Sequence, residues 1–162
     1  MRQIIKMLFS IALILSVTTC SKAGPFVSCE NQQEEWVVIV NDVTATVYNA
    51  CKEQCNADYL HTASMYKIQV EKIPEQKILA MERTMMEEYG ITYGMVVKIE
   101  GTQLFDGVWQ VQDTMNRRFK GQHKIDLLMP RHIRHGKWNN VRIYIPSNEY
   151  TKNLYTEKFK SI

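Results

Sequence analysis

Short segments rich in β-branched residues recur along this chain, and they restrict the folds open to it more than any other feature. The longest covers residues 36–48, where apolar side chains at 43, 45 and 47 alternate with Thr or Tyr at 44, 46 and 48. A repeat of two residues is typical of a β-strand with one face in a core. Four more strands are predicted at residues 94–100, 107–113, 124–129 and 140–146. Short strands with few helices favour a mainly β fold, as a small barrel or a sandwich.

The segments between and after these strands are less regular. Residues 49–67 show no clear period and are predicted to form a long loop. Residues 74–89 have two interpretations: Pro74 and Gly90 suit the start and end of one helix, but residues 77–81 also suit a strand that precedes a shorter helix. The polar segment 147–162 is predicted to be a loose C-terminal tail, so the folded domain is expected over residues 36–146.

Residues 1–19 have the pattern of an export signal. Arg2 and Lys6 precede an apolar run over residues 7–17, which is too short to span a bilayer as a helix but fits a signal-peptide core. Cys20 follows closely, as in bacterial lipoproteins, whose cysteine is lipidated. We predict a lipid anchor on Cys20 and a tether over residues 20–35, in the cell envelope at the outer membrane or in the periplasm. Cleavage after Ala23, giving a secreted protein, and an uncleaved anchor are the alternatives.

The remaining cysteines are Cys29, Cys51 and Cys55, which is an odd number. An export compartment permits disulfides, so a disulfide and free thiols are both open interpretations. A zinc site is the weaker interpretation, because no fourth ligand stands at a suitable spacing. His132 and His135 form an H-x-x-H pair beside a proline and a glycine, which fits a basic turn better than a metal site. The sequence therefore predicts neither a metal nor a cofactor.

Charge and missing motifs exclude several function classes. The formal net charge is +3, from 20 Lys or Arg and 17 Asp or Glu, and it falls to +1 without the two basic residues of the signal peptide. A near-neutral chain lacks the basic surface that nucleic-acid binding requires. The chain also has no Gly-rich phosphate loop, no G-x-S-x-G and no H-E-x-x-H. We expect a monomer that binds no nucleic acid.

Two aspartates are candidates for chemistry. Asp113 ends a predicted strand on the apolar face of that strand, and Asp126 lies inside a short apolar strand. Apolar surroundings raise the pKa of a carboxyl, so that it can hold a proton near neutral pH and act as a general acid. The structural alternative is that Asp113 starts a turn and that Asp126 caps a loop or pairs with Arg117 or Arg118.

Six motifs follow one another in a recognisable order: VTATVY at 43–48, TAS at 62–64, GVWQVQD at 107–113, KGQH at 120–123, IDL at 125–127 and VRIYI at 141–145. In this order they resemble the 3D domain, which is named for three aspartates. That domain belongs to the double-psi β-barrel group, with the rare-lipoprotein-A-like proteins and the MltA-type lytic transglycosylases. The resemblance implies a six-stranded double-psi β-barrel with one or two short helices. It also implies a groove for peptidoglycan glycan strands, and cleavage of the β-1,4 bond between N-acetylmuramic acid and N-acetylglucosamine.

The resemblance assigns roles to individual residues. Asp113 matches the aspartate of the family's D-T-G-G stretch, and Asp126 matches the last aspartate, the acid/base of the transglycosylases. Met115 and Asn116 replace the two glycines of that stretch. The first family aspartate has no clear counterpart, and Glu82 is the nearest acidic residue.

The expected chemistry needs few groups. A hydrolytic glycosidase uses two carboxylates, whereas a lytic transglycosylase uses the 6-hydroxyl of the sugar as its nucleophile, so one carboxyl suffices. Asp126 is expected to protonate the leaving oxygen and then to accept the hydroxyl proton, while Asp113 tunes its pKa and Glu82 stands in for the missing aspartate. A non-catalytic glycan- or protein-binding barrel is the alternative function. The residues expected to line the groove and bind sugar are Tyr48, Thr62, Arg118 and His123.

Overall fold

The computed structural model describes residues 33–55 and 58–162. The strands are β1 (Trp36–Tyr48), β2 (Ile78–Met81), β3 (Val96–Glu100), β4 (Gly107–Thr114), β5 (Lys124–Leu128) and β6 (Lys137–Pro146). The helices are α1 (Ile73–Gln76), α2 (Arg83–Glu88) and α3 (Glu149–Lys160), and the 3-10 turns are η1 (Val70–Lys72) and η2 (Arg117–Phe119). The predicted signal peptide, Cys20 and Cys29 lie outside the described residues.

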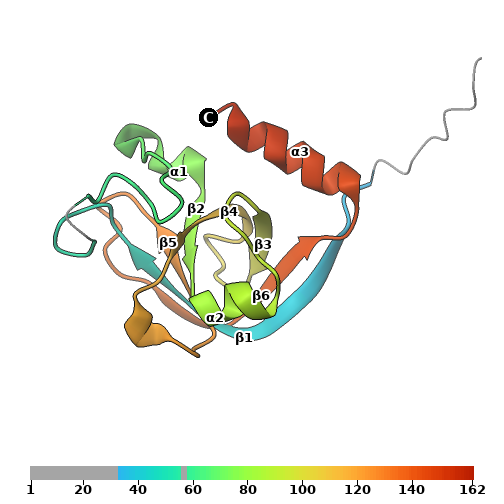
Figure 1. The fold of residues 1–162 in the computed structure, drawn as a ribbon, viewed down its shortest axis with the longest axis horizontal. Helices are drawn as coiled ribbons and strands as arrows, with labels where there is room; N and C mark the ends of the chain where they lie inside the picture. The colour runs from blue at the N-terminus through green and yellow to red at the C-terminus, as the bar shows by residue number, and fades with distance from the viewer. Residues whose placement is uncertain (1–32, 56–57) are drawn as a thin grey trace, which may run out of the picture. The chain divides into compact units, whose positions relative to one another are not determined.

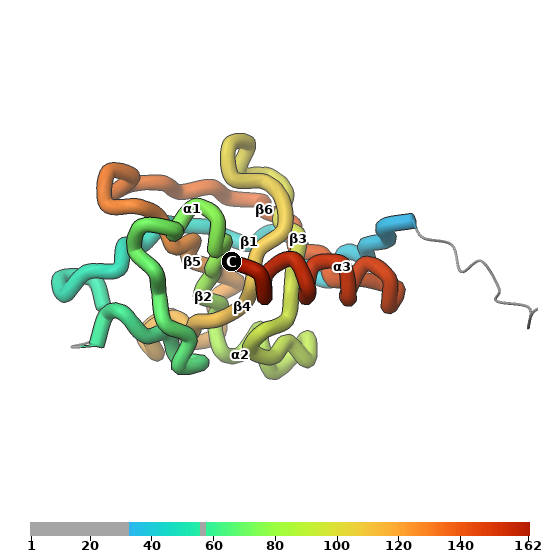
Figure 2. Tube along the Cα trace, turned by 90° about the horizontal axis from the view of Figure 1, so that it is seen from above, coloured from blue at the N-terminus to red at the C-terminus, as the bar shows by residue number. Residues whose placement is uncertain are grey.

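The six strands close into a barrel in the order β1-β5-β2-β4-β3-β6, with β6 beside β1 (Figures 1 and 2). The pairs β1–β5 and β2–β4 are parallel, and the other four pairs are antiparallel. The expectation of a mainly β fold with a six-stranded barrel and few short helices is therefore confirmed. The strands also begin and end close to the predicted positions.

One face of each strand fills the barrel. The alternation predicted for β1 holds, since Val43 and Ala45 are fully buried while Thr44 and Thr46 lie on the outer side. Trp109 is the largest side chain of this core, and its indole nitrogen donates to the carbonyl oxygen of Phe105 at 3.0 Å. The alternation therefore leaves Thr44 and Thr46 of β1, and Lys124 and Asp126 of β5, on the outer side of the barrel.

The long segment between β1 and β2 covers part of that outer surface. Its isoleucines Ile68 and Ile73 pack with Ile78 of β2 and Leu128 of β5 in a second apolar cluster outside the barrel. Tyr48, at the end of β1, packs against the same cluster. We call this segment, residues 49–77, the cover, because it lies over the outer face of β2 and β5. Cys51 and Cys55 lie at its start and do not form a disulfide with each other.

Residues 74–89 follow the second of the two sequence interpretations. They contain strand β2 and then helix α2, not one long helix. All four residues of β2 are buried, because β2 lies between β5 and β4 in the barrel wall and the cover lies outside it. Ile78, Met81, Met85 and Tyr89 also have the spacing of one helical face, but here that spacing comes from a strand followed by a helix.

The expectation of a loose tail after residue 146 is wrong. Residues 149–160 form α3, which contacts β3 and β6 (Figure 1). Thr151 is fully buried and Phe159 is 7% exposed. The hydroxyl of Thr151 accepts the backbone N–H of Glu35 at 2.8 Å, so the end of the predicted tether lies against this helix.

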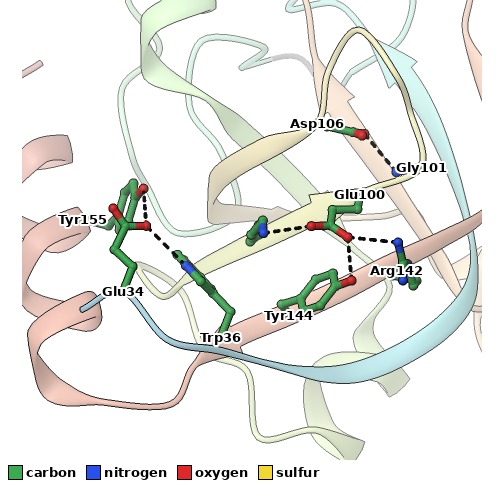
Figure 3. A network of polar contacts seen from close by, with 9 residues as sticks. Glu34, Trp36, Glu100, Gly101, Asp106, Arg142, Tyr144 and Tyr155 are labelled. Carbon is green, nitrogen blue, oxygen red and sulfur yellow. Dashed lines mark hydrogen bonds and ion pairs between the residues drawn. The ribbon is translucent and has the colours of Figure 1, made fainter. Parts of the chain in front are cut away.

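Figure 3 shows how α3 contacts the start of β1. The hydroxyl of Tyr155 donates to Glu34 at 3.1 Å, and its ring lies edge-on to Trp36 with centroids 5.5 Å apart. The folded unit therefore extends at both ends beyond the predicted 36–146. No helix in the described part of the chain is both long and apolar enough to cross a membrane.

Candidate functional site on the outer face of the barrel

A row of five residues, four of them polar, crosses the outer face of five neighbouring strands. Thr46 pairs with Asp126 on one side and Lys137 on the other, and Ala80 pairs with both Asp126 and Asp113. The two aspartates thus lie on the same face with one strand between them, roughly 10 Å apart at their Cα atoms. The row therefore reads Lys137, Thr46, Asp126, Ala80 and Asp113, on β6, β1, β5, β2 and β4.

A β-bulge brings Asp113 to this face. Sequence alternation placed Asp113 on the inner face with Val111, and that placement is wrong. Val111 pairs with Leu79, but Asp113 pairs with the next residue, Ala80, so Gln112 is an extra residue on β4. An extra residue reverses the side to which the following side chain points.

Asp113 accepts hydrogen bonds on both carboxyl oxygens. Oδ2 accepts the hydroxyl of Tyr48 at 3.1 Å, and Oδ1 accepts the backbone N–H of Ala63 at 3.0 Å and that of Thr114 at 2.8 Å. These donors come from the end of β1, from the cover and from β4 itself. Asp113 therefore links three parts of the fold and has little freedom to move toward a substrate.

Asp126 is held more loosely. The Thr46 hydroxyl donates to Oδ1, and no described residue donates to Oδ2. Burial raises the pKa of Asp126, and the nearby charge of Asp113 adds a smaller increase, while the Thr46 hydrogen bond, Lys124 and Arg118 act in the opposite direction. The result is a half-buried carboxyl that holds its proton to a higher pH than an ordinary aspartate and has one oxygen available.

Tyr48 donates to one aspartate and is close enough to the other to be affected by its charge. Its backbone is on β1, but its hydroxyl reaches Asp113 on β4, so the side chain extends across the outer face of β5 and β2. Burial, followed by the charge of Asp113, raises the pKa of Tyr48 well above its ordinary value, and Asp126 contributes to the same shift. Tyr48 therefore stays protonated and donates to Asp113 near neutral pH.

The structure gives Glu82 and Thr62 local structural contacts. Glu82 is 3% exposed and is the N-cap of α2, where Oε2 accepts the backbone N–H of Met85 at 3.2 Å. Thr62 is buried in the cover, and its hydroxyl bonds with that of Ser64 at 2.9 Å and accepts the N–H of Tyr66 at 3.2 Å. Both side chains are thus engaged within their own segments.

Arg118 and His123 are exposed on the connection before β5. The guanidinium of Arg118 lies 4.7 Å from the ring centroid of Phe119, and the ammonium of Lys124 lies 4.1 Å from it. Both cations act on the pKa of Asp126, so they lie at the edge of the site. His123 lines a separate hollow with Thr44 and Lys124. No cluster of His, Cys, Asp and Glu among the described residues could hold a metal ion.

Sequence analysis missed three groups that shape this site. Thr46 had a signal, because it alternates with the core residues of β1 on the same side as Tyr48. The sequence signal for Lys124 was weaker: it is the first residue of the strand that carries Asp126. Ala63 lies in the TAS motif, but nothing in the sequence shows that its backbone N–H donates to Asp113, fifty residues away.

Replacing Asp126 by Asn is expected to raise the melting temperature near neutral pH. A carboxyl whose pKa is raised by folding costs stability above the pKa of the unfolded chain, about 3.9 for Asp, and the full cost is present above the folded pKa. The cost disappears at lower pH, where both states are protonated. Thermal unfolding at about pH 7 and about pH 3 should therefore show a more stable variant at the higher pH and no difference at the lower. A variant less stable than wild type at neutral pH would show that the charged form is the favoured one.

No protein-family model matches the chain, and no curated protein matches it closely enough to be a relative.

Proposed function

We propose that this is an exported, lipid-anchored enzyme of the cell envelope that acts on peptidoglycan as a lytic transglycosylase. Its substrate is the β-1,4 bond between N-acetylmuramic acid and N-acetylglucosamine, and Asp126 is its acid/base. The proposal combines the motif resemblance with the closed six-stranded barrel, which is the fold that the resemblance implies. The double-psi classification and the anchor on Cys20 are parts of the same proposal.

The contrast between the two aspartates carries the proposal. Asp126 combines a raised pKa with one oxygen that no described residue occupies, which is what a general acid needs. Asp113 has both oxygens engaged by three donors, which suits a residue that positions others. One available carboxyl is sufficient for a lytic reaction but not for the two-carboxylate mechanisms of hydrolytic glycosidases.

The reaction balances with Asp126 alone. In the first half, its proton moves to the glycosidic oxygen as the bond from that oxygen to C1 of the muramic acid breaks. In the second half, the 6-hydroxyl oxygen of the same sugar bonds to C1 and its proton passes to the Asp126 carboxylate. Lys124 and Arg118 favour the carboxylate that exists between the two halves, because both lower the pKa of Asp126. The products are a free 4-hydroxyl and a 1,6-anhydro sugar.

One observation favours the alternative, a barrel that binds glycan or protein without cleaving it. The group proposed to replace the first family aspartate, Glu82, is the buried N-cap of α2. A site without that third acidic group keeps the groove but has fewer groups to stabilise charge during cleavage.

The two functions are separated by incubating purified wild-type protein with peptidoglycan sacculi. We expect soluble muropeptides that end in 1,6-anhydro sugars, detected by mass spectrometry, together with co-sedimentation of the protein with the sacculi. Co-sedimentation without any soluble product would establish the binding module instead. The absence of both co-sedimentation and soluble product would contradict both the lytic enzyme and the glycan-binding module.

A further inference from the structure

The segment from Arg117 to Lys137 is far more basic than the rest of the chain. It contains seven Lys or Arg and three His, but one acidic residue, Asp126. None of these ten basic side chains forms an ion pair with any described residue. The low net charge of the whole chain therefore hides a local excess of unpaired positive charge around the site.

Part of this excess lines two hollows that share Lys137. The first, of about 300 Å³, is lined by Asp42, Thr44, Gln122, His123, Lys124 and Lys137. The second, of about 470 Å³, is lined by Val47, Arg134, His135, Gly136 and Lys137. Because both hollows include Lys137, we treat them together as one basic trough. Asp42 is the one acidic residue in its lining.

The basic trough runs beside Asp126. Lys137 pairs with Thr46 across β6 and β1, and Thr46 donates to Asp126. Lys124 lines the trough and also acts electrostatically on Asp126. Neither Asp126 nor Asp113 belongs to the trough lining, so the trough is a neighbouring site and not the place of the bond cleavage.

The proposed substrate carries negative charge close to the bond that is cleaved. The bond is at C1 of the muramic acid, and C3 of the same ring carries a lactyl group that ends in a carboxylate or continues into the stem peptide. The stem peptide has several carboxylates of its own. A sugar with C1 at Asp126 therefore brings an anionic arm within reach of residues one or two strand widths away.

We propose that the basic trough binds the carboxylates of the lactyl–peptide arm, so that the protein selects glycan strands that carry this arm over neutral glycans. This inference rests on the proposed function for its choice of ligand. Several exposed cations act together on one anionic chain, so each contributes modestly and the effect weakens as salt is added.

The lining argues against other anionic partners. It contains no Phe, Tyr or Trp on which nucleic-acid bases could stack. Binding to a lipid surface needs exposed large apolar side chains. Those of this protein, such as Leu104 and Met65, are not in the trough lining. A carboxylate arm of a sugar needs only cations and hydrogen-bond donors, which the trough has.

The test measures binding of purified protein to two soluble glycans of similar length. One is a peptidoglycan oligomer that carries its stem peptides, and the other is a chitin oligomer, which has the same sugar backbone without the arm. We expect roughly tenfold tighter binding of the peptidoglycan oligomer at low salt, equivalent to about 1.4 kcal/mol. The advantage should shrink with added salt and after methyl esterification of the oligomer's carboxylates.

Charge reversal in the trough provides the second arm of the test. Lys137→Glu and Arg134→Glu should each reduce the advantage, and the double variant should remove most of it. The matched control Lys152→Glu, on the exposed side of α3, should leave it unchanged. Circular dichroism confirms that each variant is folded, and the esterified oligomer tests the same charge contact without any change to the protein.

Equal binding of the two oligomers, or equal binding by the trough variants and wild type, would overturn the inference. So would tighter, trough-dependent binding of duplex DNA or of anionic lipid vesicles. Binding is also measured with Asp126→Asn, which should bind without cleaving the peptidoglycan oligomer. A wild-type protein that releases no anhydro sugars but prefers the peptidoglycan oligomer would contradict the proposed enzyme and leave the trough assignment intact.

Discussion

Replacing Asp126 by Asn is expected to reduce the release of anhydro-muropeptides by at least about 10²-fold, the lower end of what a positioned general acid contributes. Asn has the same shape and can still accept the Thr46 hydroxyl, but it has no proton to give to the leaving oxygen. Binding to sacculi should change little. The measurement is the initial rate of product release, with co-sedimentation as the second readout.

Two further variants make this result specific. Asp58→Asn is the matched control, because Asp58 is exposed and contacts His61 in the loop before β2. It should keep the wild-type rate. Asp113→Asn should reduce the rate less than Asp126→Asn, since Asp113 acts by holding Tyr48 and the cover in place. An Asp126→Asn protein with full activity would remove Asp126 from the mechanism.

Replacing Phe159 by Ala is expected to cost about 3 kcal/mol of unfolding free energy and to lower the melting temperature by roughly 10 °C. Phe159 is 7% exposed on the inner side of α3, so the truncated side chain leaves a cavity where the helix meets the barrel. Leu154→Ala is the control on the same helix. Leu154 is 39% exposed, and its truncation should cost less than about 1 kcal/mol. Chemical denaturation of both variants gives the comparison.

Equal stability of the two variants would mean that α3 adds little to the fold, as the sequence suggested. This helix was hard to predict because its buried side starts with a threonine. Thr151, Tyr155 and Phe159 are spaced four residues apart on one side of α3, but only two of them are apolar enough to suggest a stripe. The partner groups, Glu34, Glu35 and Trp36, are more than a hundred residues away in the chain.

Five of the six barrel strands were predictable because each carries its own signal, whereas β2 was one of two interpretations of its segment. Alternation in β1 and β5, and the glycine at the start of β4, depend on local sequence and survive in the structure. The order of the strands in the barrel could come only from the family resemblance. Local patterns do not record which strands pair, since pairing depends on long-range contacts.

The candidate site was predictable only in part. The choice of Asp113, Asp126 and Tyr48 came from the resemblance and from strand alternation, and all three lie on one face. The alternation rule nevertheless misplaced Asp113, because a β-bulge leaves no mark in a single sequence. The capping role of Glu82 was equally hidden, since Glu is not among the preferred N-cap residues.

The most direct test of the central claim is to digest sacculi with the wild-type protein in water enriched in heavy oxygen. If Asp126 acts alone with the 6-hydroxyl of the sugar as nucleophile, the new muramic acid ends will be 1,6-anhydro sugars that contain no heavy oxygen. Mass spectrometry of the soluble products measures this. Reducing ends that contain heavy oxygen would show that water is the nucleophile, and would contradict the lytic mechanism and the single-carboxyl role of Asp126.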